Sequence, residues 1–343
     1  MSPKFVLSKS KVLEQYNKVS KLADQVSYSS KTNQLVTKIL EKEIDCLFSV
    51  HLENELQHVK DLSRVIFLSQ GWTENYIREL IDKGINYFVV DNEPDLDILA
   101  DFLKNNDVKI NLLLRLKLKE LSIRTEKFFV FGMASDIINK KIRELRTNKN
   151  IETLGIHFHR KTQNMSEWNL KQELSEIIEE DVLEMIDVVN IGGGLPSEYA
   201  NTNVNVLNSI FEKIKELKVW LNKNNVKMII EPGRFIAAPS CKLITKIIGV
   251  FQNNIIVNAS VYNSDMDALV VPVKLLIKGE LKQGEGKPYI IKGITPCSMD
   301  LFRYRVYLKN PKVGDEIVFL NAGAYNFTTD FCDLEKIETE VIK

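Results

Sequence analysis

The sequence has few of the features that mark secreted, membrane-spanning or metal-binding proteins. Its four cysteines are scattered and form no Cys-x-x-Cys pair, so neither a disulfide framework nor a zinc site is predicted. No uninterrupted apolar run approaches the length of a membrane span, and the N-terminal MSPKFVLSKSKVLEQ lacks the continuous apolar core of a signal peptide. We therefore expect no bound metal and a cytoplasmic location.

The sequence also has no surplus of positive or negative charge. The 343 residues include 46 Lys and Arg against 46 Asp and Glu. Proteins that bind nucleic acid or anionic membranes usually have a basic surplus, so we expect neither partner. The composition, 44% hydrophobic and 27% charged, is that of an ordinary globular protein, long enough for one large domain and a smaller one.

Short apolar runs rich in Val, Ile and Phe alternate with longer amphipathic stretches through the first two thirds of the chain. Stretches such as 73–84 and 205–223 carry apolar residues at three- and four-residue spacing, which predicts helices. Eight strands that alternate with helices predict a closed (β/α)8 barrel of the TIM type over residues 15–238. An open doubly wound sheet is the alternative, but it would need a glycine-rich turn after its first strand, where this chain has SKTN. The eight runs are 26–30, 46–50, 64–69, 87–92, 110–116, 154–159, 188–194 and 227–233.

The pattern of the sequence changes after Pro239, from alternating strands and helices to strand-like segments alone, and this change predicts a second domain over residues 239–343. Strand-like segments are separated there by Gly, Pro, Asn and Asp, and no long helical pattern is present, so a smaller all-β sandwich or barrel is expected. Residues 1–14 either add a strand to this domain or lead into the first helix. The strand-like segments are KLITKIIGVFQ, ASVYN, YIIKG, EIVFLN and KIETEVI.

Polar and glycine residues gather where the predicted barrel strands end, and this edge of a barrel carries the chemistry of such folds. Taken singly, each has an ordinary explanation: a strand-end lysine can reach solvent, a strand histidine can belong to the core, and three glycines can form a turn. Their common position at one end of the strands is harder to attribute to chance. They are Lys31, Ser49, His157, His159, Gly192, Gly193, Gly194, Glu231, Gly233 and Arg234.

These residue types match the parts of one cofactor. Backbone N–H groups freed by glycines bind phosphate, and Arg234 could add a bidentate contact. A histidine can stack on a planar ring, a carboxylate such as Glu231 can hold a pyridine nitrogen protonated, and a lysine with a lowered pKa can form an imine with an aldehyde. Phosphate, aromatic ring, pyridine nitrogen and aldehyde together describe pyridoxal 5'-phosphate.

A series of segments then resembles, in order, the barrel-type pyridoxal-phosphate decarboxylases of ornithine, arginine, diaminopimelate and carboxynorspermidine, which have the alanine racemase-like fold called fold type III. The resemblance spans nearly the whole chain. Its segments are YSSKTN, VIFLSQGWTENYIRELIDKGINYFVVDN, GIHFHRKTQ, VNIGGGLP, EPGRFIAAPS, TPCSMD and VGDEIVFLNAGAYNF.

The resemblance implies a role for each matching residue. Lys31 would be the Schiff-base lysine, His159 would lie on the cofactor ring, and Glu231 would pair with the pyridine nitrogen. Cys297 would enter the active site of the partner subunit and protonate the product carbanion, which implies a homodimer with shared active sites. The phosphate would be bound by Thr162, in place of a family serine, together with Gly192, Gly193, Gly194, Gly233, Arg234 and Tyr325.

The implied reaction is α-decarboxylation of a basic or diamino L-amino acid to an amine and CO2, in polyamine or lysine metabolism.

Three departures from the family's pattern leave the identity of the substrate open. Arg160–Lys161–Thr162 stands where the family has glycine-serine, and the two added cations, Arg160 and Lys161, either recruit an acidic substrate group or point outward. Ser298 follows the cysteine where ornithine enzymes have an acidic residue, and Asp300 either compensates as a substrate ligand or matches another family aspartate. Val270 and Val271 occupy the region of a second specificity marker.

Two other functions remain open at this point. An amino-acid racemase of the same fold would place an arginine, not Glu231, at the pyridine nitrogen. A catalytically inactive regulatory homologue would typically lose the lysine or the phosphate motifs, and this chain keeps both.

Overall fold

The computed structural model describes residues 2–118 and 131–343, which form two compact units. We call them the barrel unit, made of Asn17–Pro196 and Val206–Gly233, and the β unit, made of Met1–Tyr16, Ser197–Asn205 and Arg234–Lys343. Each unit is built from separated stretches of chain. The domain ranges expected from the sequence, 15–238 and 239–343, stay a prediction.

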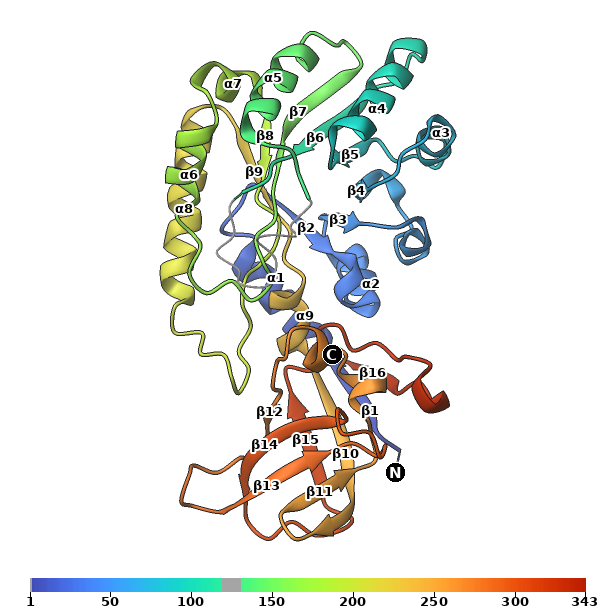
Figure 1. The fold of residues 1–343 in the computed structure, drawn as a ribbon, viewed down its shortest axis with the longest axis vertical. Coiled ribbons are helices and arrows are strands. Elements are labelled where there is room, and N and C mark those ends of the chain that lie inside the picture. Colours follow the sequence, from blue (N-terminus) through green and yellow to red (C-terminus); the bar gives the residue numbers. More distant parts are fainter. Residues whose placement is uncertain (1, 119–130) are drawn as a thin grey trace. The chain divides into compact units, whose positions relative to one another are not determined.

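Eight parallel strands close the barrel, as the sequence predicted (Figure 1). Each strand pairs with the next along the chain, and the last returns to pair with the first through Gln25 and Val26 opposite Ile229 and Ile230. Closure leaves no free sheet edge and brings the carboxyl ends of all eight strands to one rim. The strands are β2 (Gln25–Ser29), β3 (Leu47–Val50), β4 (Val65–Ser69), β5 (Tyr87–Val90), β6 (Ile110–Arg115), β7 (Ile151–His157), β8 (Val188–Asn190) and β9 (Lys227–Ile230).

Amphipathic helices alternate with these strands. The two segments predicted from apolar spacing, 73–84 and 205–223, form α3 (Glu74–Asp82) and α8 (Leu207–Lys223). Helix α3 begins where the Thr73 side chain accepts a hydrogen bond from the Tyr76 N–H at 3.2 Å. The other helices are α2 (Gln34–Glu43), α4 (Glu93–Asn105), α5 (Ser135–Leu145), α6 (Leu170–Ile177) and α7 (Glu180–Met185), with short 3-10 turns η1 (Ser30–Thr32), η2 (Glu53–His58) and η3 (Leu62–Arg64).

Aliphatic side chains of different strands meet in a buried cluster of the barrel: Ile66, Val89, Leu113, Val188 and Ile229. β-Branched and leucine side chains suit this position because they pack well on a pleated surface. Burying each of them contributes roughly 1.5–3 kcal/mol. This packing holds the strands in register, and the register decides which side chains stand at the rim.

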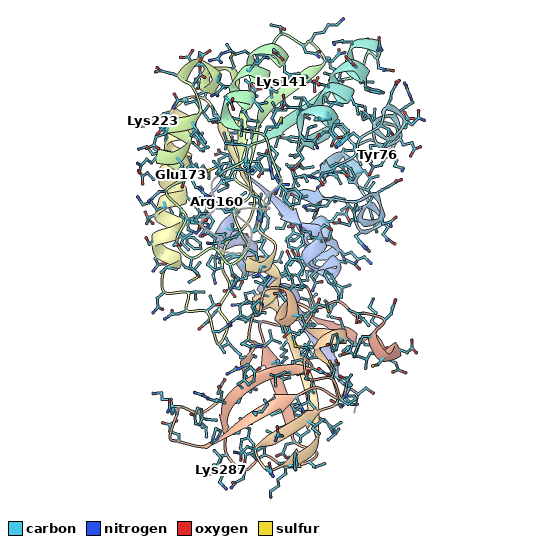
Figure 2. The ribbon with its side chains drawn as sticks, in the orientation of Figure 1. Tyr76, Lys141, Arg160, Glu173, Lys223 and Lys287 are labelled. Carbon is cyan, nitrogen blue, oxygen red and sulfur yellow. The ribbon has the colours of Figure 1, made fainter. Side chains whose placement is uncertain are left out.

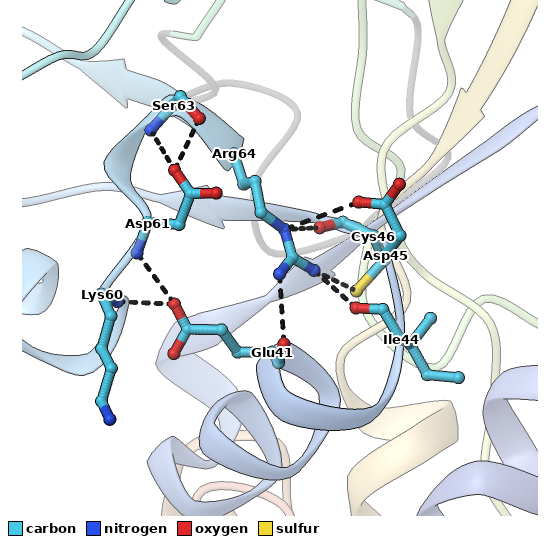
Figure 3. A network of polar contacts seen from close by, with 8 residues as sticks. All are labelled: Glu41, Ile44, Asp45, Cys46, Lys60, Asp61, Ser63 and Arg64. Carbon is cyan, nitrogen blue, oxygen red and sulfur yellow. Dashed lines mark hydrogen bonds and ion pairs between the residues drawn. The ribbon is translucent and has the colours of Figure 1, made fainter.

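The Arg64 guanidinium ties the end of α2 to two barrel strands (Figure 3). It donates to the carbonyls of Ile44 at 2.7 Å and Cys46 at 2.8 Å, and to that of Glu41 at 3.2 Å. The last carbonyls of a helix have no partner within the helix, so this arginine satisfies groups that would otherwise be unpaired. The Glu41 carboxylate accepts the N–H groups of Lys60 and Asp61 in the same network.

The β unit contains an eight-stranded sheet with the neighbour order β12-β15-β10-β11-β13-β14, to which β1 and β16 are attached. The first residues do both things that were considered: β1 pairs with β10 and β16, and α1 (Lys9–Val19) follows directly. The strands are β1 (Lys4–Ser8), β10 (Cys241–Phe251), β11 (Asn254–Val257), β12 (Leu276–Ile277), β13 (Lys287–Lys292), β14 (Leu301–Leu308), β15 (Glu316–Leu320) and β16 (Glu338–Ile342).

One expected strand of the β unit is wrong. The segment ASVYN contains a single helical turn, α10 (Val261–Ser264), because the Ser260 side chain accepts the Tyr262 N–H and Asn263 bonds back to the Ser260 N–H in a capping box. Three strands, β11, β12 and β14, were not anticipated. The remaining short elements are α9 (Arg234–Ser240), α11 (Asp267–Val270) and η5 (Phe331–Asp333). No helix in the described ranges is both long and apolar enough to cross a bilayer.

Candidate active site

Lys31 lies in the 3-10 turn η1, directly after β2 and therefore at the rim of the barrel. The next residue but one, Asn33, begins α2 by accepting the Leu35 N–H at 3.0 Å, so the chain turns sharply at the lysine. The side chain keeps solvent-accessible surface, yet enough protein surrounds it that burial lowers the pKa of Lys31. Glu55 and Glu231 offset part of that shift. A lowered pKa increases the fraction of neutral amine, the form that reacts with a carbonyl.

Glu231 follows β9 and has three side-chain partners. It accepts from Ser49 Oγ at 2.7 Å and Asn190 Nδ2 at 2.9 Å, and its other oxygen lies 3.2 Å from His157 Nε2. Burial alone would raise the pKa of this carboxyl group, but His157 and the two hydrogen bonds hold it below the usual range. Glu231 is therefore a fixed negative charge.

His159 stands two residues beyond the end of β7, against the glycine loop 192–194. Its Nδ1 accepts the Gly193 N–H at 3.1 Å, so the ring proton of neutral His159 is on Nε2. Burial, together with the charges of Arg115 and Lys31, lowers the pKa of His159 to about 3, so the ring is uncharged at neutral pH. An uncharged ring held by a backbone amide is suited to lie flat against a planar ligand.

The glycine loop requires glycine for two reasons. Gly192 has a φ of +64°, and a Cβ there would lie 2.4 Å from the carbonyl oxygen of Phe158. A Cβ at Gly193 would lie 2.6 Å from the carbonyl oxygen of Glu231. The loop therefore runs in backbone contact with the segment after β7 and with the end of β9.

Sequence reasoning missed His51 and Glu55, which follow β3 and act electrostatically on Lys31. The His51 N–H donates to Glu55 Oε1 at 3.3 Å, while His51 Nδ1 lies 4.0 Å from Glu55 Oε2. Burial, together with the charge of Lys31, lowers the pKa of His51 to about 3. Burial raises the pKa of Glu55. Their position at a strand end was the available clue, because Lys31, His159 and Glu231 share it.

A second group, to which the sequence assigned no role, joins three strand ends. Asp91 after β5 accepts from Gln70 Nε2 after β4 at 2.8 Å, and forms an ion pair with Arg115 at the end of β6 at 3.1 Å. Asp91 is 1% exposed, so this pair is internal to the barrel. Arg115 depresses the pKa of both Lys31 and His159, which places its positive charge toward the same rim.

Arg160 is buried and paired within the protein. It forms an ion pair with Glu173 of α6, and both residues are labelled in Figure 2. It also pairs with Glu167 at 3.5 Å, and Lys161 pairs with Glu167 at 2.8 Å. Arg160 neither points outward nor offers an unmatched charge, and this does not support its expected role as a substrate ligand. Thr162 lies half-buried in the same loop.

In the β unit, Arg234 and Tyr325 lie together. The Arg234 guanidinium pairs through both terminal nitrogens with Asp267 and donates to the Tyr199 hydroxyl at 3.0 Å. It also lies 5.1 Å from the centre of the Tyr325 ring. Gly233, the residue before Arg234, belongs to the barrel unit, where a Cβ would strike Thr32 Oγ1.

Cys297 and Asp300 have different surroundings. Cys297 is half-buried, with its Sγ 3.2 Å from the Tyr262 hydroxyl, and Ser298 beside it is exposed. Asp300 is fully buried and accepts from the N–H groups of Val261 and Thr295 and from the Thr295 hydroxyl. These bonds make Asp300 a structural residue of its loop and do not support the substrate-binding role expected of it.

The chain belongs to the pyridoxal-dependent decarboxylases: residues 9–238 match the model of that family's pyridoxal binding domain. It is an enzyme whose cofactor is pyridoxal phosphate.

Named relatives and solved structures agree with this assignment. The chain is 22% identical over 326 residues to the diaminopimelate decarboxylase of Campylobacter jejuni, covering 89% of this chain and 80% of the relative. It is 24% identical over 396 residues to the ornithine decarboxylase of Candida albicans, covering 98% and 82%. Its fold matches that of the lysine/ornithine decarboxylase of Vibrio vulnificus complexed with cadaverine, with a TM-score of 0.82, 21% identity and coverage of 100% and 95%.

The residues of the barrel rim fit this cofactor. Lys31 supplies an amine, Glu231 a fixed negative charge for a ring nitrogen, and the glycine loop a cradle that any side chain would fill. Among the residues that the structure describes, the buried atoms Thr32 Oγ1 and His157 Nδ1 have no hydrogen-bond partner. Within residues 2–118 and 131–343, no cluster of three or more His, Cys, Asp or Glu side chains is arranged to hold a metal ion.

Proposed function

We propose that this decarboxylase removes the α-carboxylate of a basic or diamino L-amino acid, with Lys31 as the residue that carries pyridoxal phosphate. The observation that supports it most is Lys31 itself: a lysine at a strand end, with its pKa lowered by burial, on the same rim as Glu231 and the glycine loop. Bound pyridoxal phosphate supplies an electron-accepting ring that stabilises the negative charge left when CO2 departs.

Around that ring, the residues of the barrel have separate tasks. Glu231, ionised and held by Ser49, Asn190 and His157, keeps a proton on the pyridine nitrogen. His159, uncharged and fixed by Gly193, lies against the face of the ring. Phosphate binding is the task we give to the glycine loop, where no side chain fills the space, and to the residues near it: Gly192, Gly193, Gly194, Gly233, Thr162, Arg234 and Tyr325. The N–H groups of Gly192 and Gly193 already donate to Asn190 Oδ1 at 2.9 Å and to His159 Nδ1 at 3.1 Å.

Proton delivery is the task we give to Cys297. Its thiol stands in the β unit and protonates the carbon that has lost CO2, and we place it in the active site of a partner subunit. A homodimer with two shared sites follows from that assignment, and we also retain a cytoplasmic location as part of the proposal.

The substrate class is drawn from the relatives, which are named as diaminopimelate, ornithine and lysine/ornithine decarboxylases. The choice between polyamine and lysine metabolism stays open, because Arg160 and Asp300 are both engaged in internal contacts. Assaying CO2 release from ornithine, lysine, arginine, meso-diaminopimelate and carboxynorspermidine would decide it. Turnover of none of the five would contradict the proposed class.

The cofactor role of Lys31 has a direct test. Lys31→Ala removes the amine, so we expect loss of the visible absorbance of bound cofactor and a fall in kcat by at least about 10³-fold. Lys38→Ala, on the exposed face of α2, is the matched control and should keep both properties. An unchanged spectrum and rate in Lys31→Ala would overturn the assignment.

A further inference from the structure

Cys297 does not stand alone in the β unit, because a tyrosine hydroxyl is directed at its sulfur. The distance from Tyr262 Oη to Cys297 Sγ is 3.2 Å, within hydrogen-bond range for a sulfur partner. Tyr262 comes from α10, in the segment that was expected to be a strand, so its approach to Cys297 could not be anticipated from the sequence.

Both ends of Tyr262 are fixed. Its N–H donates to Ser260 Oγ at 3.1 Å, and its carbonyl accepts the Thr329 N–H at 2.9 Å. Its ring stacks on Phe331, with centroids 4.1 Å apart and planes inclined by 27°. The stacking leaves the ring little freedom, so the hydroxyl is held in place without help from the cysteine.

The contact of 3.2 Å allows either atom to donate, and the directions of the two pKa shifts fit a phenol that donates to the sulfur. The hydrogen bond from Tyr262 holds the pKa of the Cys297 thiol below its usual value, and the same bond raises the pKa of Tyr262 to about 12. This combination is expected when a phenol donates to a thiolate. The other titratable groups that act on the pair are Asp300, which opposes the shift of Cys297, and Cys332, which acts on Tyr262.

We propose that Tyr262 is a positioning residue for Cys297: its hydroxyl orients the sulfur and stabilises the thiolate left after proton transfer. This inference rests on the proposed function only for its catalytic meaning. The hydrogen bond itself can be tested by the reactivity of the thiol, without any turnover.

The test is alkylation of the holoenzyme by iodoacetamide across pH, in a Cys332→Ser background so that Cys297 is the exposed thiol followed. Tyr262→Phe keeps the stacked ring and removes the hydroxyl. We expect the midpoint of the pH–rate profile to rise by about one unit and the rate at pH 7 to fall about fivefold to tenfold, as the thiolate fraction decreases. Tyr304→Phe, an exposed tyrosine of the same unit, is the control and should leave the profile unchanged.

A profile of Tyr262→Phe that superimposes on that of the parent would overturn the proposal. If that variant fails to fold, the thiolate absorbance of the parent compared with Cys297→Ser gives the midpoint of Cys297 directly, and a midpoint at or above the ordinary thiol value overturns it. Full turnover in Cys297→Ser would contradict the proposed function instead, while leaving the alkylation result valid.

Discussion

Gly192 combines a left-handed backbone with a close approach of another chain segment, and the two effects can be separated. Gly192→Ala adds a methyl that would lie 2.4 Å from the Phe158 carbonyl oxygen, at a φ of +64°. Gly71→Ala is a matched control, because Gly71 has a φ of +74° but nothing within 4 Å of its Cβ position. Both variants should lose about 1 kcal/mol of stability from the backbone strain.

Only Gly192→Ala should lose cofactor, because only there must the neighbouring segment that carries His159 move. We expect its affinity for pyridoxal phosphate, measured by equilibrium titration of the absorbance, to fall at least about tenfold. Equal affinities in the two alanine variants would show that the close approach has no part in binding.

His51 makes a separate prediction about acid stability. Its pKa is about 3 in the folded protein against an ordinary 6.5. Between these values the unfolded chain binds a proton that folded His51 does not, so the free energy of unfolding falls as pH drops from 6.5 towards 3. His51→Gln removes this dependence and should flatten the decline by up to about 2 kcal/mol between pH 6.5 and 5.

Urea unfolding at the two pH values measures that difference. His58→Gln, in the same 3-10 turn as Glu55, is the control and should decline as steeply as the parent. A His51→Gln variant with the parent's slope would mean that the ring is not buried in its neutral form.

At the scale of elements, an ion pair between Arg160 and Glu173 connects the loop after β7 to α6. Arg160 pairs with Glu167 and Glu173, whereas Lys161 pairs with Glu167 alone and is one third exposed. Removing one partner of a buried ion pair is costly, so Arg160→Met should lower the free energy of unfolding by about 3 kcal/mol. Lys161→Met, the control, should change it by less than about 1 kcal/mol.

The same pair of variants tests the substrate role expected of Arg160. If the arginine is structural, the folded fraction of Arg160→Met should keep the KM of the parent within about twofold, since about 1.4 kcal/mol of lost binding would already be tenfold. A stable Arg160→Met protein with a tenfold higher KM would restore the substrate role.

Elements also show where local chemistry overrides propensity. The segment ASVYN has a β-branched and an aromatic residue and was expected to be a strand, but Ser260 and Asn263 bond to the backbone and produce a helical turn. Ser260 and Asn263 have the spacing of a capping box, and this signal in the sequence would have predicted the helical turn α10. Nothing in the sequence would have shown that this turn aims Tyr262 at Cys297, since 35 residues separate them.

At the scale of the whole molecule, shared sites predict complementation. Neither Lys31→Ala nor Cys297→Ala should be active alone. In a mixture of equal amounts, subunit exchange in a twofold dimer makes half of the dimers mixed, and each mixed dimer has one intact site. Activity should therefore recover to about a quarter of the parent's. Absence of recovery after verified subunit exchange would contradict the shared site.

The sequence by itself determined the eight strands, the rim on which the chemistry lies, and the family, because apolar periodicity and short motifs are local properties of the chain. Tertiary structure decided what the polar side chains do. Arg160 and Asp300 looked available for substrate, yet packing pairs the first with Glu167 and Glu173 and buries the second under backbone donors. His51, Glu55 and Tyr262 acquire their partners only on folding. Burial, charge neutralisation and pKa shifts depend on neighbours brought together by the fold, and spacing along the chain does not specify them.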